Sequence, residues 1–234
     1  GDEWRLTGTP QNSEVLSPYE SLVELKANVS RSDMPVPGGA GVLPGQRRFG
    51  AIQTELEFLL CAPDGEDLED VHRRFRRGWS SATRERPCVI QIESDHPLSP
   101  LAFELVVDGV LPGSSVDMRR RSSESMSVPV VCFEGLAQSG VTTGTGVVTV
   151  TNKGDVPVCP KIRYSGAGGP VVGPSEARFT LPASSSETVV DLDPMVLRLE
   201  GAFSESVPPG ESGTWTLPKG ARLEWSMGVA DPWG

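Results

Sequence analysis

Apolar and polar residues alternate clearly in the segment 54–61. Leu56, Phe58 and Leu60 fall on one side of an extended chain, and two glutamates fall on the other. This period of two predicts a strand with one buried face. Shorter apolar runs predict further strands in the first half of the chain, at 23–27, 88–93, 102–107 and 126–133. Pro129 favours an edge or a bulge in the last of them, because proline has no N–H to donate.

One segment has the period of a helix. Leu68, Val71, Phe75 and Trp79 recur at helical spacing and define a single apolar stripe. Acidic residues precede the stripe and arginines close it, which matches the helix macrodipole. Asp64 is the expected cap, with Asp67 three residues further on. The arginine cluster 73–77 is therefore interpreted first as an ordered helix end and second as a binding patch.

The pattern changes after residue 135. A polar stretch of small residues, 136–146, is expected to be a linker or a crossing loop. Short strands with turns between them then recur at the spacing of a β-sandwich. The expected strands are 147–151, 161–164, 177–181, 188–192, 196–200, 213–217 and 222–227.

These patterns predict a mainly β protein with two domains. Residues 1–135 form an α+β domain with one amphipathic helix on a sheet, and residues 147–234 form an all-β sandwich. Within the first domain, prolines and glycines crowd the segment 34–45, which is expected to be a long irregular loop. Loops of this length are usually functional or disordered. The residues singled out in this segment are Met34, Pro35, Val36, Pro37, Leu43 and Pro44.

Composition and charge narrow the function. Of 234 residues, 21 are Lys or Arg and 31 are Asp or Glu, a formal net charge of −10. A dedicated nucleic-acid binder needs a positive surface, so that class is disfavoured. No apolar run approaches the roughly 20 residues of a membrane helix. The first residues lack the pattern of a signal peptide. Cysteines 61, 88, 132 and 159 form no CxxC pair, so a zinc ribbon or redox motif has no support. Their even number permits disulfides, but buried free thiols are favoured.

The sequence shows no catalytic motif. There are two histidines, His72 and His96, and no HExxH, GxSxG, Walker or helix-opening GxGxxG pattern. Asp191 and Asp193 form a close acidic pair at the end of a predicted strand, and they fit a solvated turn better than a glycosidase pair. The triplet Arg119–Arg121 fits pairing with nearby acids better than a phosphate grip. We therefore predict no enzymatic activity, no catalytic residue, no metal ligand and no cofactor.

Trp215 and Trp225 are the candidates for a sugar-binding platform, since exposed tryptophans stack on sugar rings. Both lie on predicted strands of the sandwich, so the competing interpretation places them in the core or on a sheet face.

The order of these segments resembles the distal tail protein family of long-tailed, non-contractile bacteriophages (siphophages). The resemblance rests on an entry strand, a helix, a strand with an Asn-x-Gly turn, a Pro-Gly turn and an aromatic ending. In this chain they are 48–50 with 54–60, 67–77, 148–162, 188–191 with 207–210, and 225–233. The segment 34–45 and the triplet at 119–121 have no counterpart in the pattern.

The resemblance implies a structural virion protein at the tail tip, made in the cytoplasm of the host bacterium. The first domain would build a homo-oligomeric ring, a hexamer, between the tail tube and hub or tape-measure-associated proteins. The second would be a galectin-like sandwich that carries receptor-binding proteins. DNA would pass through the ring without specific binding, and segment 34–45 would serve as an inter-subunit arm. The alternatives are a carbohydrate-binding module and a carboxylate-based hydrolase.

Overall fold

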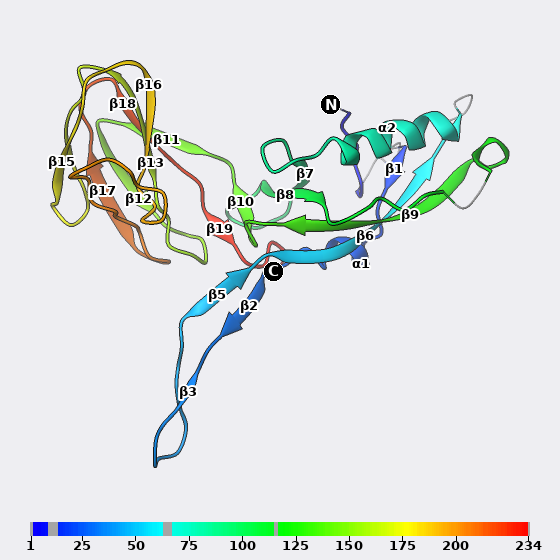
Figure 1. Ribbon diagram of the computed structural model, residues 1–234, viewed down its shortest axis with the longest axis horizontal. Coiled ribbons are helices and arrows are strands. Elements are labelled where there is room, and N and C mark those ends of the chain that lie inside the picture. The colour runs from blue at the N-terminus through cyan, green and yellow to red at the C-terminus, as the bar shows by residue number, and fades with distance from the viewer. Residues whose placement is uncertain (1, 9–13, 63–66, 115–116, 234) are drawn as a thin grey trace. The chain divides into compact units, whose positions relative to one another are not determined.

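The computed structural model describes residues 2–8, 14–62, 67–114 and 117–233 (Figure 1). The chain divides into two compact units. The first comprises residues 1–91, 102–137 and 230–234, and the second comprises 92–101 and 138–229. Strands dominate both units, so the prediction of a mainly β protein is confirmed.

The longest pairing in the molecule joins β6 (Ile52–Cys61) to β9 (Ser123–Cys132). The two strands are antiparallel and in register over their full length, from Ile52↔Cys132 to Cys61↔Ser123. They belong to a seven-stranded sheet of order β1-β6-β9-β8-β10-β19, in which β7 also pairs with β8. The remaining strands are β1 (Val15–Leu16), β7 (Cys88–Ile92), β8 (Leu101–Val107), β10 (Ala137–Ser139) and β19 (Gly228–Val229).

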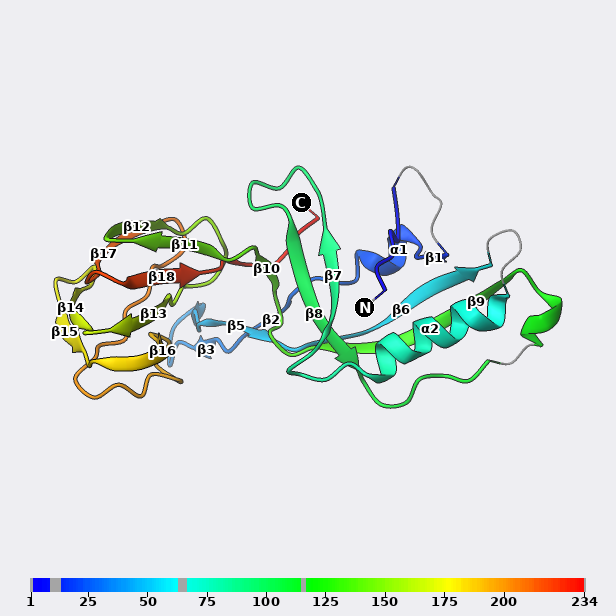
Figure 2. The same cartoon turned by 90° about the horizontal axis from the view of Figure 1, so that it is seen from above.

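Helix α2 (Leu68–Ser80) packs on the apolar face of β6 and β9 (Figure 2). The predicted stripe is buried, and the ring centroids of Phe58 and Phe75 lie 5.0 Å apart. The helix is capped by Asp67, whose carboxylate accepts a hydrogen bond of 3.1 Å from the Glu69 N–H. Asp64, the expected cap, lies outside the described residues. The amphipathic helix on a sheet is confirmed.

Two details of the first unit differ from the sequence prediction. Segment 23–27 is not a strand: a short helix, α1 (Tyr19–Leu22), precedes it, and Leu25 is buried after a turn. A further 3₁₀ turn, η1 (Met118–Arg120), was not anticipated.

The edge or bulge expected at Pro129 is wrong, because Pro129 lies inside the central strand β9 and pairs with Glu55 in unbroken register. On the β8 side the last strand pair is Val107↔Val130, and the Pro129 carbonyl accepts a hydrogen bond of 2.9 Å from the Asp108 N–H just beyond the end of β8. The missing proline N–H therefore falls where the ladder with β8 stops.

The second unit is a sandwich of two four-stranded antiparallel sheets, as predicted. Its core combines large buried residues of both sheets, Trp215, Ile162, Leu181 and Leu223 among them. One sheet has the order β11 (Thr142–Thr145), β18 (Ala221–Trp225), β13 (Lys161–Gly166), β16 (Ser184–Asp191). The other has the order β12 (Val147–Thr151), β17 (Ser212–Thr216), β14 (Gly169–Val172), β15 (Arg178–Leu181).

The expected linker and two strand assignments need correction. Much of the segment 136–146 forms strands β10 and β11, and β11 pairs with β18 of the sandwich. Its residues are mostly exposed, so no apolar alternation marks it in the sequence. Segment 196–200 is not a strand, because the N–H groups of Val196 and Leu197 turn back to the Asp193 carbonyl. Strand β14 was missed, and residues 230–233 pack with the first unit.

The Asn-x-Gly turn at Asn152 is held by a buried side chain. Asn152 is 1% exposed, and its Nδ2 donates to the carbonyls of Val156 and Val207 at 2.8 Å each. Its Oδ1 accepts from the Gly154 N–H, also at 2.8 Å. One amide thus satisfies three backbone groups, and its bonds to Val207 and Gly154 are buried from water.

Replacing Asn152 by Ala should destabilise the sandwich by about 3 kcal/mol, because two buried backbone groups and one half-buried group lose their partner. The free energy of unfolding from chemical denaturation measures the loss. Lys153→Ala, at the exposed neighbouring position, is the control and should stay within about 0.5 kcal/mol of the parent. Equal stability of the two variants would contradict this account.

Candidate functional site

The segment 34–45, expected to be irregular, forms the end of a two-part β-hairpin (Figure 1). In the first part β2 (Asn28–Arg31) pairs with β5 (Arg47–Gly50). In the second, β3 (Met34–Pro35) pairs with β4 (Val42–Leu43). The expectation of a loop is therefore wrong, because two-residue strands around a glycine turn tolerate prolines that a longer strand would not. We call residues 28–50 the arm.

The joint between the two parts of the arm is fixed by Asp33. Its Oδ2 accepts a hydrogen bond of 2.7 Å from Arg31, and its Oδ1 accepts one of 2.8 Å from the Gly45 N–H. These bonds, that of Arg31 first, hold the pKa of the Asp33 carboxyl below its usual value. A Cβ at position 45 would overlap the Ser32 carbonyl, so only glycine allows this approach.

The arm exposes several large apolar side chains to solvent. Met34 is 64% exposed, Val42 55% and Leu43 53%, and Val29 is exposed too. Val36 is half-buried, whereas Pro35, Pro37 and Pro44 are exposed. A two-stranded hairpin is marginally stable by itself in water, so such a surface favours burial against another protein.

The face of β6 and β9 opposite the α2 side has a different chemistry. Glu55 and Glu57 are exposed on β6, and Glu104 is exposed at the matching face of β8. Ser127 on β9 donates a hydrogen bond of 3.1 Å to Glu55. No Lys or Arg occupies this face on these three described strands. We call it the acidic sheet face.

The two tryptophans proposed as a sugar platform do not form one. Trp215 is 0% exposed in the sandwich core, so neither face of its ring is free to stack on a sugar. Trp225 is half-buried and packs against the same core. Their Nε1 atoms are buried and have no hydrogen-bond partner in the described structure. The competing core interpretation fits these positions.

The acidic pair and the histidines are engaged in local structure. Asp191 Oδ1 accepts from the Asp193 N–H at 3.0 Å, and Asp191 Oδ2 contacts Lys161 Nζ at 3.0 Å. The Nδ1 of His96 accepts from the Leu98 N–H at 3.1 Å within a turn. His72 is buried 3.8 Å from Glu124, and burial lowers its pKa. Among the described residues no cluster of three or more acidic, His or Cys side chains is placed to hold a metal ion.

Both arginine clusters pair with nearby groups, which the sequence predicted for the triplet 119–121 only; the cluster 73–77 was expected at a helix end, but α2 continues to Ser80. In α2, Arg73 pairs with Asp70, and Arg74 contacts Glu14 at 2.9 Å. Arg76 donates to the carbonyls of Leu111 and Pro112. In the triplet, Arg119 lies 3.4 Å from Glu69 and Arg120 lies 3.6 Å from Asp117.

The cysteines form no disulfide, and no described helix is long and apolar enough to cross a membrane. Burial raises the pKa of the Cys88, Cys132 and Cys159 thiols. Thiols of this kind are poorly reactive.

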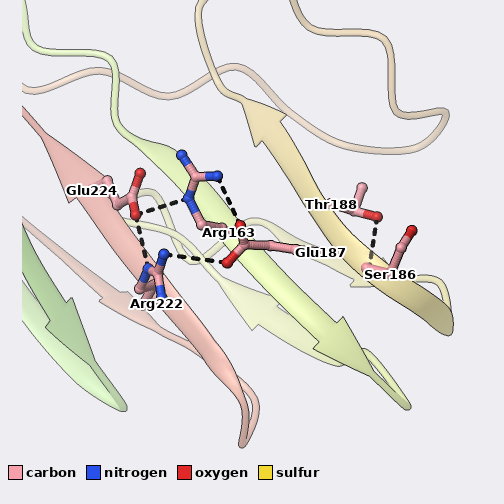
Figure 3. A network of polar contacts seen from close by, with 6 residues as sticks. All are labelled: Arg163, Ser186, Glu187, Thr188, Arg222 and Glu224. Atoms are coloured by element: carbon pink, nitrogen blue, oxygen red, sulfur yellow. Dashed lines mark hydrogen bonds and ion pairs between the residues drawn. The ribbon is translucent and has the colours of Figure 1, made fainter.

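Sequence reasoning missed a ring of four charges on the outer face of the sandwich (Figure 3). Arg163 donates to Glu224 at 2.9 Å and to Glu187 at 3.1 Å. Arg222 donates to the same two glutamates, at 2.8 and 3.2 Å. Arg163, Arg222 and Glu224 occupy outward positions of the alternating strands β13 and β18, whereas Glu187 lies in an exposed run of β16 that shows no alternation. We call these four residues the charged ring.

Two β-rich units, one bearing a helix on a long sheet and an exposed hairpin, define the class of fold. No protein-family model matches the chain, and no curated protein matches it significantly. Solved structures do. The Dit protein of phage SPP1, described as a paradigm of the hub adsorption apparatus in phages that infect Gram-positive bacteria, aligns with a TM-score of 0.53 and 14% identity over 92% of both chains.

The baseplate of phage P2 gives two further matches. Its activated conformations with Ca and with Sr both align with a TM-score of 0.56 over 95% of both chains, at 10% and 12% identity. The chain therefore has the fold of phage Dit and baseplate proteins. The resemblance inferred from the sequence is confirmed at the level of the fold.

The charged ring predicts a pH-dependent stability. Hydrogen bonds from Arg163 and then Arg222 hold the pKa of Glu224 below its usual value. A carboxylate of this kind stabilises the fold above its unfolded pKa, about 4.3, and the stabilisation is lost as pH falls through the lowered folded value. Glu224→Gln should therefore lower the melting temperature at pH 7, and the difference from the parent should shrink towards pH 3.

Thermal denaturation at both pH values tests this expectation. Glu211→Gln, a change at an exposed position outside the ring, is the matched control and should behave like the parent at both. A Glu224→Gln deficit of the same size at pH 7 and pH 3 would show that the ring contributes no charge-dependent stability.

Proposed function

We propose that the chain is a structural virion protein of a long non-contractile phage tail, forming an oligomeric ring at the distal tail tip. The observation that carries this proposal is the fold, shared with Dit and baseplate structures over 92–95% of the chain. The ring, a hexamer in this proposal, joins the tail tube to hub or tape-measure-associated proteins. The sandwich carries receptor-binding proteins, and the protein is made in the host cytoplasm. Neither the fold nor the described residues call for an enzymatic role.

The arm supports self-association in particular. Its strands are exposed on both sides, and its free edges offer unpaired backbone groups to a neighbouring chain. Burying Met34, Val42 and Leu43 against an identical subunit would gain about 1.5–3 kcal/mol per fully buried side chain. A repeated head-to-tail contact of this kind closes into a ring when its rotation allows.

Charge substitution at the arm tests self-association. Met34→Asp combined with Leu43→Asp should shift the purified protein from ring to monomer, because burying two carboxylates costs more than the apolar contact returns. Light scattering and electron microscopy measure the change in mass and shape. Met195→Asp, at a methionine that is 90% exposed in the sandwich, is the control and should leave the ring intact. A ring that persists in the arm variant would refute the assignment of the arm.

The acidic sheet face supports the passage of DNA. In a ring of six subunits whose acidic sheet faces line the channel, Glu55, Glu57 and Glu104 of each subunit would face the passing DNA with carboxylates and without cations. DNA is a polyanion that binds surfaces by releasing counterions to Lys and Arg. A face without these residues repels it, so we assign this face to the channel.

Reversing charge on that face should convert repulsion into binding. The ring of Glu55→Lys/Glu57→Lys should retard linear duplex DNA in a gel-shift experiment at low salt, and salt should abolish the shift. The parent ring should not bind. Glu200→Lys/Glu211→Lys makes the same change in net charge on the sandwich and serves as the control. Equal DNA retention by both double variants would show that only net charge matters and that the acidic face has no special position.

A further inference from the structure

The charged ring is an arrangement that stability alone does not require. Arg163 and Arg222 lie directly opposite each other on neighbouring strands, and like charges in such a pair are destabilising. Glu187 and Glu224 offset that repulsion only by ordering four long side chains, which costs conformational entropy. Exposed ion pairs return about 0–1 kcal/mol each. The Arg222–Glu187 pair is of that weak kind, because its side chains are 47% and 55% exposed, whereas Glu224, which both arginines contact, is 14% exposed.

In the described structure, the outer face of the other sheet of the sandwich is polar without any network of charged residues. Its outward positions on β12 and β17 carry hydroxyls that pair across the strands, Thr149 with Thr214 at 2.9 Å and Thr151 with Ser212 at 2.8 Å. No charged residue is needed there on the two strands. The concentration of arginine and glutamate on the β18-β13-β16 face therefore distinguishes one surface of the unit.

A hollow of about 520 Å³ adjoins the charged ring. Its size lies within the range of small-molecule sites. Arg163, Arg222 and Lys219 line it together with a single carboxylate, Glu187. The remaining lining comes mainly from the turns at 145–146 and 217–220. With Glu224, which accepts from both arginines behind the lining, the group still carries one net positive charge in a chain of net charge −10, and this favours an anionic ligand.

The hydrogen bonds of the charged ring leave part of each guanidinium uncommitted. Its hydrogen bonds use Nε and Nη1 of Arg163, and Nε and Nη2 of Arg222. Each guanidinium therefore keeps one amino group that the ring does not use, held in place by the other bonds. Two such groups suit an anionic oxygen pair. The exposed Glu187 adds an acceptor for hydroxyl groups, and Leu217 and Pro218 add an apolar wall.

We infer that this hollow binds a saccharide bearing an acidic group, a carboxylate or a phosphate, with Arg163 and Arg222 gripping the acid. Hydroxyls of the sugar ring are both donors and acceptors, and they match the mixed arginine and glutamate surface. This inference goes beyond the proposed ring function and does not depend on it. It also places recognition on a face of the sandwich other than the tryptophans suggested by the sequence.

Calorimetric titration of the full chain tests the inference. The probes are a glucuronate-containing disaccharide, glucose 6-phosphate and neutral maltose, with acetate and inorganic phosphate as bare anions. We expect one or both acidic saccharides to bind at least tenfold more tightly than maltose and than the corresponding bare anion. The two acidic arms distinguish a carboxylate from a phosphate ligand. No binding of either acidic saccharide at 10 mM, or equal binding of the bare anion, would overturn the inference.

Variants locate the site. Arg222→Gln should weaken binding of the acidic saccharide at least tenfold, whereas Arg178→Gln, on an outward position of β15 in the other sheet, should leave it unchanged. Arg222→Lys keeps the charge but not the two-pronged donor, and should give an intermediate loss. Melting curves and light scattering verify that each variant is folded and assembled. Unchanged affinity in a folded Arg222→Gln protein refutes the site. A chain that binds the acidic saccharide but does not assemble into an oligomeric ring counts only against the proposed tail function.

Discussion

The pairing of β6 with β9 is the constraint on which the rest of the first unit depends. Ten consecutive residue pairs hold the two strands in one register. Because side chains alternate, this register gives one apolar face for α2 and one acidic face, and a slip of one residue would exchange them. The same strands position their neighbours: β5 of the arm leads into β6, and the turn after β9 lies so close to Gly50 that position 135 accepts only glycine.

The elements that the sequence predicted are those in which burial is one-sided. Strand β6 and helix α2 each place large apolar residues on one face, so their periods are visible. The arm and β11 are exposed on both faces, which leaves no alternation to detect. Proline and glycine indicated an irregular arm, yet a hairpin forms because its short strands lose few ladder bonds to Pro35. Hydrophobic periodicity therefore predicts only those strands and helices that bury one face in the core. It does not predict strands that are exposed on both faces.

The candidate sites divide in the same way. The arm was located by composition, since prolines and apolar residues crowd one short segment. Trp215 was considered both for a sugar platform and for the core, and its neighbours favour the core: Thr214 and Thr216 are exposed, so the residue between them points inward. The charged ring could not be found from sequence spacing. Arg163 lies 24 residues from Glu187 and 61 from Glu224, and only the order β18-β13-β16 brings the three strands together.

The sequence identity to the solved structures is low, 10–14%. Such a value is expected when the core determines the fold and surface residues are free to differ. A core tolerates extensive substitution provided that its volume and its polar pattern are kept, so the fold survives when few residues match. Outward positions carry no such constraint and diverge with the partner that they meet. The solved structures therefore establish the fold, whereas the arm and the charged ring must be argued from this chain alone. Function specific to this protein is accordingly expected at positions that the core leaves free, and both surfaces occupy such positions.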